Sequence, residues 1–140
     1  MYVIDASVAV KWLIPEEGRA EARRFLTGSD ALLAPRPMVT EVAAGLSRKA
    51  RAGQISKPAA RRALREWLAL IDSGGIELAD SKALIGEALE ISLALNHPLP
   101  DCLYLALARQ SRAVLVTADQ PLAKKAAELQ GLNVRLLGAE

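Results

Sequence analysis

The chain has 140 residues, a length that suits a single domain with a substantial buried core. Hydrophobic residues make up 51% of it, which excludes a disordered chain. Its apolar runs are shorter than the roughly 18 residues of a membrane span, and its N-terminus lacks the regions of a secretory signal, so we expect a cytoplasmic protein. The single cysteine, Cys102, excludes an internal disulfide and a cysteine-based zinc site.

The net charge is only +2, but the charges are unevenly distributed along the chain. Residues 42–65 contain seven basic residues and no acid. Residues 66–101 contain seven acids and one basic residue, Lys82. This contrast fits a polarised surface that attracts polyanions, and it fits ordinary solvated helical faces at least as well.

Short apolar runs predict strands, and apolar residues at helical spacing predict helices. The predicted strands, in chain order, cover residues 2–4, 31–34, 76–79, 114–117 and 133–136. The predicted helices, in the same order, cover residues 6–13, 19–26, 37–52, 56–72, 80–95, 100–111 and 120–130. The residues that the fourth helix is expected to bury are Ala60, Leu64, Trp67, Leu68 and Ile71.

Strands alternate with helices along the whole chain, which is typical of a parallel sheet with helices on both faces. We therefore predict an α/β fold, a three-layer α/β/α sandwich with a parallel sheet of about five short strands. No linker or internal repeat divides the chain, so residues 1–140 are expected to form one domain.

Two acids follow predicted strands. Asp5 comes directly after the first strand, and Asp119 comes two residues after the strand over residues 114–117. The carboxyl ends of parallel strands meet at one edge of a sheet, where ligands bind. If these two strands are neighbours, the two carboxylates approach each other. The alternative is that Asp5 only caps the helix that follows it.

Glu41 and Asp101 lie in the first turns of two predicted helices. Acids at such positions also stabilise a helix through its macrodipole, so each has a purely structural interpretation. The residues after Asp101, 102–108, are apolar nearly all round, which predicts a buried helix whose N-terminus faces a cleft. The only histidine, His97, precedes Pro98, where a solvated turn residue is the favoured interpretation over a general base.

Four carboxylates that converge repel one another unless a cation joins them. A site of carboxylate oxygens without Cys or His favours Mg²⁺ or Mn²⁺ over zinc or copper. Two hydroxyls, those of Ser7 and Thr117, stand beside two of the acids. They can orient a carboxylate or a water molecule, or they can be ordinary residues of a cap and a strand end.

Four segments in order resemble the PIN domain, and the chain as a whole resembles the VapC-type toxins of type II toxin–antitoxin systems. The matching segments are Val3-Ile4-Asp5-Ala6-Ser7-Val8, Glu41, the run from Pro100-Asp101-Cys102 to Ala108, and Thr117-Ala118-Asp119. The resemblance implies a metal-dependent endoribonuclease with Asp5, Glu41, Asp101 and Asp119 as its acids. It also implies a homodimer and a small antitoxin partner. Some relatives carry a further acid, but residues 122–125 contain none, which puts a second metal site in doubt.

On this basis we expect Asp5 and Asp101 to bind one Mg²⁺ or Mn²⁺, with Asp119 completing or supporting the site. Glu41 would hold or deprotonate the attacking water, which leaves products with a 5′-phosphate and a 3′-hydroxyl. The side chains expected to hold RNA phosphates are Lys11, Arg36, Arg48, Lys49 and Arg51. Aromatic residues are only 4% of the chain, which favours recognition of a structured RNA over base stacking.

Three other functions fit parts of the pattern. A phosphatase with Asp5 as an aspartyl nucleophile usually has a second acid two residues later, where this chain has Ser7. A PIN-like module that binds RNA or protein without turnover would use the acids only to hold a structural ion or to cap helices. A nuclease of the same fold that acts on DNA would carry the same acids.

Overall fold

The computed structural model describes residues 1–138. The strands are β1 (Tyr2–Ile4), β2 (Leu32–Pro35), β3 (Glu77–Ala79), β4 (Val114–Thr117) and β5 (Asn133–Leu136). The helices are α1 (Ala6–Leu13), α2 (Arg19–Thr27), α3 (Met38–Arg51), α4 (Lys57–Asp72), α5 (Ser81–Leu95), α6 (Leu99–Ser111) and α7 (Gln120–Ala126). Strands and helices alternate as the apolar pattern predicted.

The strands form one sheet in the order β3-β2-β1-β4-β5, and every neighbouring pair is parallel. The central strand is β1, whose Val3 lies opposite Leu33 of β2 on one side and Leu115 of β4 on the other. Because β1 and β4 are parallel neighbours, the residues that follow them leave the sheet at the same edge. The condition for Asp5 and Asp119 to approach each other is therefore met.

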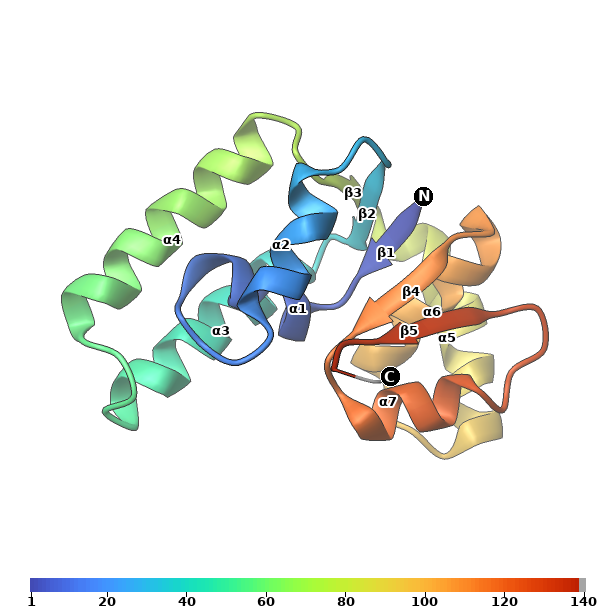
Figure 1. Ribbon diagram of the computed structural model, residues 1–140. Coiled ribbons are helices and arrows are strands. Elements are labelled where there is room, and N and C mark those ends of the chain that lie inside the picture. The colour runs from blue at the N-terminus through green and yellow to red at the C-terminus, as the bar shows by residue number, and fades with distance from the viewer. Residues whose placement is uncertain (139–140) are drawn as a thin grey trace.

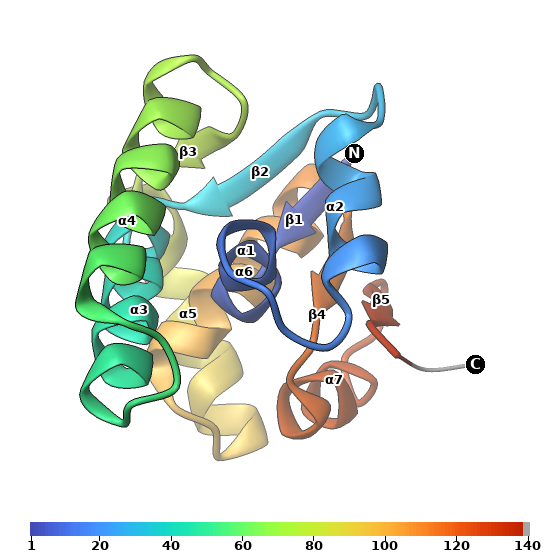
Figure 2. The ribbon, with the colours of Figure 1, turned by 60° about the vertical axis from the view of Figure 1, so that its left-hand side comes forward.

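Helices cover both faces of this sheet (Figures 1 and 2). The right-handed crossovers of parallel strands place α1 to α4 on one face and α5 to α7 on the other. α6 packs against β1, β2 and β4, and α5 packs on the outer side of α6. α3 and α4 form a helical hairpin that extends beyond the sheet, at the left of Figure 1. The predicted three-layer α/β/α sandwich is confirmed.

Two sequence predictions at the level of elements are wrong in detail. The helix expected over residues 120–130 ends at Ala126, because Glu128 and Leu129 donate to carbonyls only three residues earlier and so tighten the chain into turns. In α4, Trp67 is buried, but Leu64 and Leu68 are 36% and 44% exposed. α4 packs against α3, where Trp67 Nε1 donates to the carbonyl of Val39, and it also contacts α1. Leu64 and Leu68 lie outside these contacts, on the exposed side of the helix.

Candidate active site

Asp5 follows the central strand and is almost completely buried, with 6% of its surface exposed. Its Oδ2 accepts a 2.6 Å hydrogen bond from Ser7 Oγ and a 2.9 Å hydrogen bond from Thr117 Oγ1. Burial raises the pKa of the Asp5 carboxyl above its ordinary value, although the two hydroxyl groups act in the opposite direction. Asp5 stands at the N-cap position of α1, but its side chain makes no capping hydrogen bond to that helix, so the simple cap interpretation is wrong.

The two hydroxyls join the ends of β1 and β4. Ser7 Oγ accepts from the backbone N–H of Ala118 at 3.0 Å, and Thr117 Oγ1 accepts from the N–H of Asp119 at 3.0 Å. Each hydroxyl therefore donates to Asp5 and accepts from the turn after β4. Of the two interpretations that the sequence left open for Ser7 and Thr117, the structure favours the one in which they orient a carboxylate.

Asp119 caps a helix and also lines the hollow that contains Asp5. Its Oδ1 accepts from the N–H of Leu122 at 3.2 Å and so caps α7. The same side chain lines the hollow that contains Asp5. The cap engages Oδ1, and Oδ2 has no hydrogen bond among the described residues.

Glu41, in the first turn of α3, accepts a 3.2 Å hydrogen bond from the hydroxyl of Tyr104 in α6. Burial, and then the negative charges of Asp5 and Asp101, raise the pKa of Glu41 to about 7, while the bond from Tyr104 acts to lower it. Burial, and then the negative charges of Glu41, Asp5 and Asp101, raise the pKa of Tyr104 above its ordinary value. The Tyr104 hydroxyl therefore keeps its proton and stays a donor.

Sequence reasoning missed Tyr104, which appeared only as part of an apolar helix. The available signal was its spacing from Asp101, because residues three apart lie on the same side of a helix. The expectation for His97 is wrong as well. Its side chain is only 12% exposed, and its Nε2 lies 2.8 Å from Asp101 Oδ2.

The four predicted acids line a single hollow of about 290 Å³ at the carboxyl edge of the sheet. The full lining is Asp5, Ala6, Ser7, Val10, Glu41, Ala44, Gly45, Arg48, Asp101 and Asp119. A Cβ atom at Gly45 would lie 3.2 Å from Val10 Cγ2, so glycine at this position lets α3 approach α1 closely. The close approach of α1 and α3 brings Glu41 to the acids at the strand ends.

The donor set of this hollow fits a hard divalent cation. Its acids present oxygen atoms, and within residues 1–138 none of the four forms an ion pair with a Lys or Arg side chain. The raised pKa values of Asp5 and Glu41 are the consequence of burial and negative charge without a compensating cation.

As they stand, the carboxylates are held by their own neighbours and not by one another. Asp101 is bonded to His97, Glu41 to Tyr104, and Asp119 to the N-terminus of α7. In the part of the chain that the structure describes, no three His, Cys, Asp or Glu side chains are grouped closely enough to hold an ion in this arrangement. Direct binding of one ion by three of these side chains therefore requires at least one of them to move.

Beside the acidic hollow lies a second hollow of about 320 Å³ with three cationic side chains, Lys11, Arg48 and Lys49. Both hollows include Ser7, Val10, Gly45 and Arg48 in their linings. One carboxylate, that of Glu16, bridges two of the cations, at 3.2 Å from Lys11 Nζ and 2.9 Å from Lys49 Nζ. The other two predicted RNA-binding residues, Arg36 and Arg51, are exposed near the two ends of α3 and lie outside both linings.

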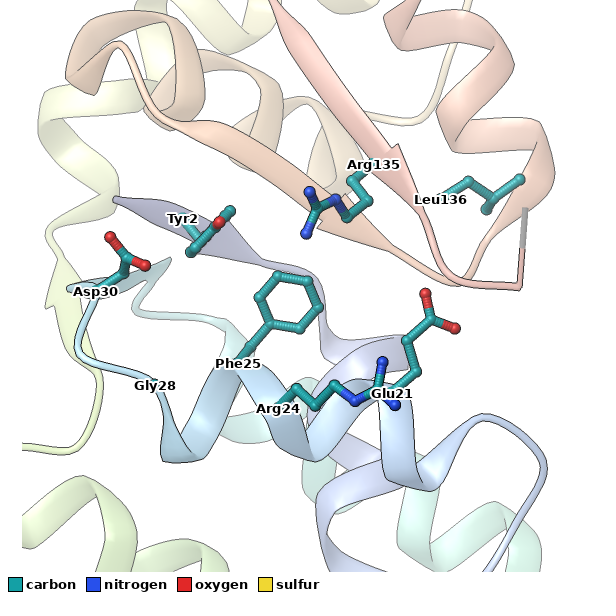
Figure 3. Close-up of a pocket in the computed structure, with 8 residues that line it drawn as sticks. All are labelled: Tyr2, Glu21, Arg24, Phe25, Gly28, Asp30, Arg135 and Leu136. Carbon is teal, nitrogen blue, oxygen red and sulfur yellow. The ribbon is translucent and has the colours of Figure 1, made fainter. Parts of the chain in front are cut away.

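A further hollow of about 310 Å³ lies between α2 and β5 and contains none of the four predicted acids (Figure 3). Arg135 places its guanidinium 5.6 Å from the centre of the Phe25 ring, and Tyr2 meets the same ring edge-on at a centroid distance of 5.0 Å. None of the residues that line this hollow belongs to the hollow that the four predicted acids line.

The chain is similar in sequence to known proteins. The family model of the PIN domain matches residues 2–128 of this chain. A VapC ribonuclease of Mycobacterium bovis is 33% identical over 119 residues, which are 85% of this chain and 86% of that protein. Ribonuclease VapC9 of Mycobacterium tuberculosis matches with the same identity and coverage. The chain belongs to the PIN domain family.

Solved structures share the fold. A protein from Pyrobaculum aerophilum matches with a TM-score of 0.69 and 22% identity, over 95% of this chain and 82% of that chain. A toxin–antitoxin complex from Klebsiella pneumoniae gives 0.64 and 16%, over 94% and 95%. VapBC2 from Rickettsia felis, bound to a DNA fragment from its promoter, gives 0.63 and 15%, over 96% and 97%. Within residues 1–138, no helix has the length and apolarity to cross a membrane.

Proposed function

We propose that this protein is a metal-dependent endoribonuclease and the toxin of a toxin–antitoxin pair. The observation that carries the proposal is the convergence of Asp5, Glu41, Asp101 and Asp119 on one hollow in a chain of the PIN domain family. Relatives with 33% identity over most of the chain are named VapC ribonucleases. We propose that residues 1–140 act as a single domain, in the cytoplasm, where RNA is found.

In this proposal Asp5 and Asp101 hold one Mg²⁺ or Mn²⁺, and Asp119 completes the site with its free oxygen. Such a cation lowers the pKa of a water molecule and offsets the charge that develops on the phosphate. Ser7 and Thr117 keep the Asp5 carboxylate in place through the two hydrogen bonds to Oδ2.

Glu41 is the proposed general base. A carboxylate whose pKa lies at about 7 can accept a proton from water near neutral pH, and the hydroxyl of Tyr104 keeps that carboxylate oriented. Attack by water on phosphorus breaks the bond to the 3′-oxygen, and that oxygen takes up a proton. The products therefore carry a 5′-phosphate and a 3′-hydroxyl.

RNA phosphates are proposed to bind in the cationic hollow, since Lys11, Arg48 and Lys49 line it and it shares four lining residues with the hollow of the acids. Arg36 and Arg51 are proposed to contact the backbone farther along. The Klebsiella structure is a toxin–antitoxin complex and the Rickettsia structure is VapBC2, and we propose a small antitoxin as a partner of this chain too.

A homodimer is also proposed. Three apolar side chains four residues apart on α5, Ile85, Leu89 and Leu93, are 43%, 48% and 69% exposed. Residues at this spacing form one stripe along a helix, and burial of the stripe against a second copy would remove it from water.

Controlled expression of the wild type and of Asp5→Asn, with mapping of RNA ends in each, tests the proposed function. Growth arrest and new RNA ends with a 5′-phosphate are expected only with the wild type. Equal cleavage by both proteins would reject the assignment of the site. Wild-type protein that binds RNA without producing new ends would instead indicate a binding module.

A further inference from the structure

His97 is the only histidine of the chain, and its ring lies against one of the four acids. Its Nε2 is 2.8 Å from Asp101 Oδ2, and the His97 side chain is only 12% exposed whereas that of Asp101 is 31% exposed. The ring thus covers one oxygen of Asp101 from the protein side. The Asp101 side chain also lines the hollow that contains Asp5.

The backbone around His97 holds the ring in this position. His97 follows the end of α5, where Asn96 adopts a left-handed conformation with φ 51°. The N–H of His97 donates to the carbonyl of Ser92 at 3.2 Å, and Ser92 Oγ donates to the carbonyl of His97 at 2.6 Å. Two hydrogen bonds to one residue of α5 therefore fix the short loop that carries the imidazole.

The chemistry of the pair determines the direction of its hydrogen bond. A carboxylate can only accept, so the proton between the two groups must belong to Nε2 of His97. This bond occupies Oδ2 of Asp101, and Oδ1 has no hydrogen bond among the described residues. The contact therefore limits rotation of the carboxylate and leaves one oxygen available as a ligand.

We infer that His97 is a positioning residue for Asp101, one that orients this carboxylate toward the bound divalent cation. The inference rests on the proposed function, in which Asp101 is a ligand of the cation. His97 does not itself act as a ligand or as a base. A ligand that loses the partner which orients it typically binds its metal about 10- to 100-fold more weakly.

The test measures binding of Mn²⁺ to tag-free protein by the electron paramagnetic resonance signal of the free ion. His97→Leu removes the donor, whereas His97→Gln keeps an N–H group. We expect His97→Leu to weaken Mn²⁺ binding by about 10- to 100-fold and His97→Gln to restore most of the loss. Asp101→Asn is the control that loses the ligand, and circular dichroism with thermal melting verifies that each variant is folded.

A second measurement needs no change at His97. Because the chain has one histidine, its imidazole nitrogens give a single, assignable set of ¹⁵N signals. We expect the proton on Nε2 in the metal-free protein, and a shift of that signal on addition of Mg²⁺ in the wild type but not in Asp101→Asn. A proton found only on Nδ1, or an Nε2 signal that Mg²⁺ leaves unchanged, would overturn the inference even if His97→Leu did not fold.

The outcomes separate the two levels of the proposal. Wild-type protein that binds no Mn²⁺ would reject the metal site and the role of His97 together. Wild-type protein that binds Mn²⁺ as tightly as a folded His97→Leu variant would reject only the role of His97 and leave the proposed function intact.

Discussion

The hydroxyl of Thr117 donates a 2.9 Å hydrogen bond to the carboxylate of Asp5, which lies 112 positions earlier in the chain. Thr117 is fully buried at the end of β4, and Asp5 follows β1, the neighbouring strand. The same hydroxyl accepts from the N–H of Asp119. One side chain therefore connects two of the four acids and holds the edge of the sheet where they meet.

Replacement of Thr117 by Val keeps the shape of the side chain and removes both hydrogen bonds. The carboxylate of Asp5 and the N–H of Asp119 then lose a partner, which costs about 1–3 kcal/mol in the free energy of unfolding. Urea denaturation measures the change, and Thr117→Ser, which keeps the hydroxyl, is the matched control. A Val variant as stable as the Ser variant would contradict this role.

Glu41 makes the stability of the metal-free protein depend on pH. Its pKa rises from 4.5 to about 7 on folding, so in this range the folded state binds more protons than the unfolded state. The free energy of unfolding therefore falls as pH rises from about 4.5 to about 7, and the stabilisation present at low pH is lost above that range.

Glu41→Gln should flatten this dependence, which urea denaturation in a chelator at pH 5 and pH 8 will measure. The difference between variant and wild type is the relevant quantity, because the remaining acids titrate in both proteins. An identical pH dependence in the two proteins would show that Glu41 is not held in this environment.

Addition of Mn²⁺ should raise the melting temperature of the wild type, because an ion that binds only the folded state stabilises it by mass action. The rise should shrink in Asp101→Asn, which lacks one of the proposed ligands. Differential scanning fluorimetry over a series of Mn²⁺ concentrations measures both. Equal rises in the two proteins would count against Asp101 as a ligand.

Glu16 holds the side chains of Lys11 and Lys49 beside the acidic hollow. Glu16→Gln frees both ammonium groups for phosphates, so we expect RNA to bind more tightly. The binding constant should also fall more steeply with salt concentration, by the equivalent of about one to two phosphate contacts. Binding is measured in the Asp5→Asn background to prevent cleavage.

The neighbouring Glu17→Gln is the matched control for Glu16. It removes the same charge, but only the backbone carbonyl of Glu17 contacts Lys11. Equal effects of the two substitutions would indicate a general charge effect and reject the specific competition of Glu16 with phosphate.

The stripe on α5 predicts the oligomeric state. Leu89→Glu places a charge in the middle of the stripe and should convert a dimer into a monomer in light scattering coupled to size exclusion. Leu68→Glu, at a site of 44% exposure on α4 that matches the 48% of Leu89, should leave the dimer intact. A dimer that survives Leu89→Glu would exclude this face of α5.

The sequence by itself determined the local elements, because a helix and a strand impose different periods on their apolar residues. It also determined which acids follow strands and open helices, and hence that they could meet at one edge of a parallel sheet. The end of α7 and the buried face of α4 were predicted less well. A local pattern of apolar residues does not distinguish the last turn of a helix from the turns that follow it. It also does not show which side of a helix a neighbouring element covers.

Only the tertiary structure decided which side chains hold these acids. Thr117 reaches Asp5 because β4 is the neighbour of β1, and Tyr104 reaches Glu41 because α6 and α3 come together across 63 positions. His97 faces Asp101 because a loop closed on Ser92 turns its ring inward. Hydrogen bonds of this kind form only when segments that are distant in the chain are placed to within a few tenths of an ångström. No periodic pattern in the sequence records such a placement.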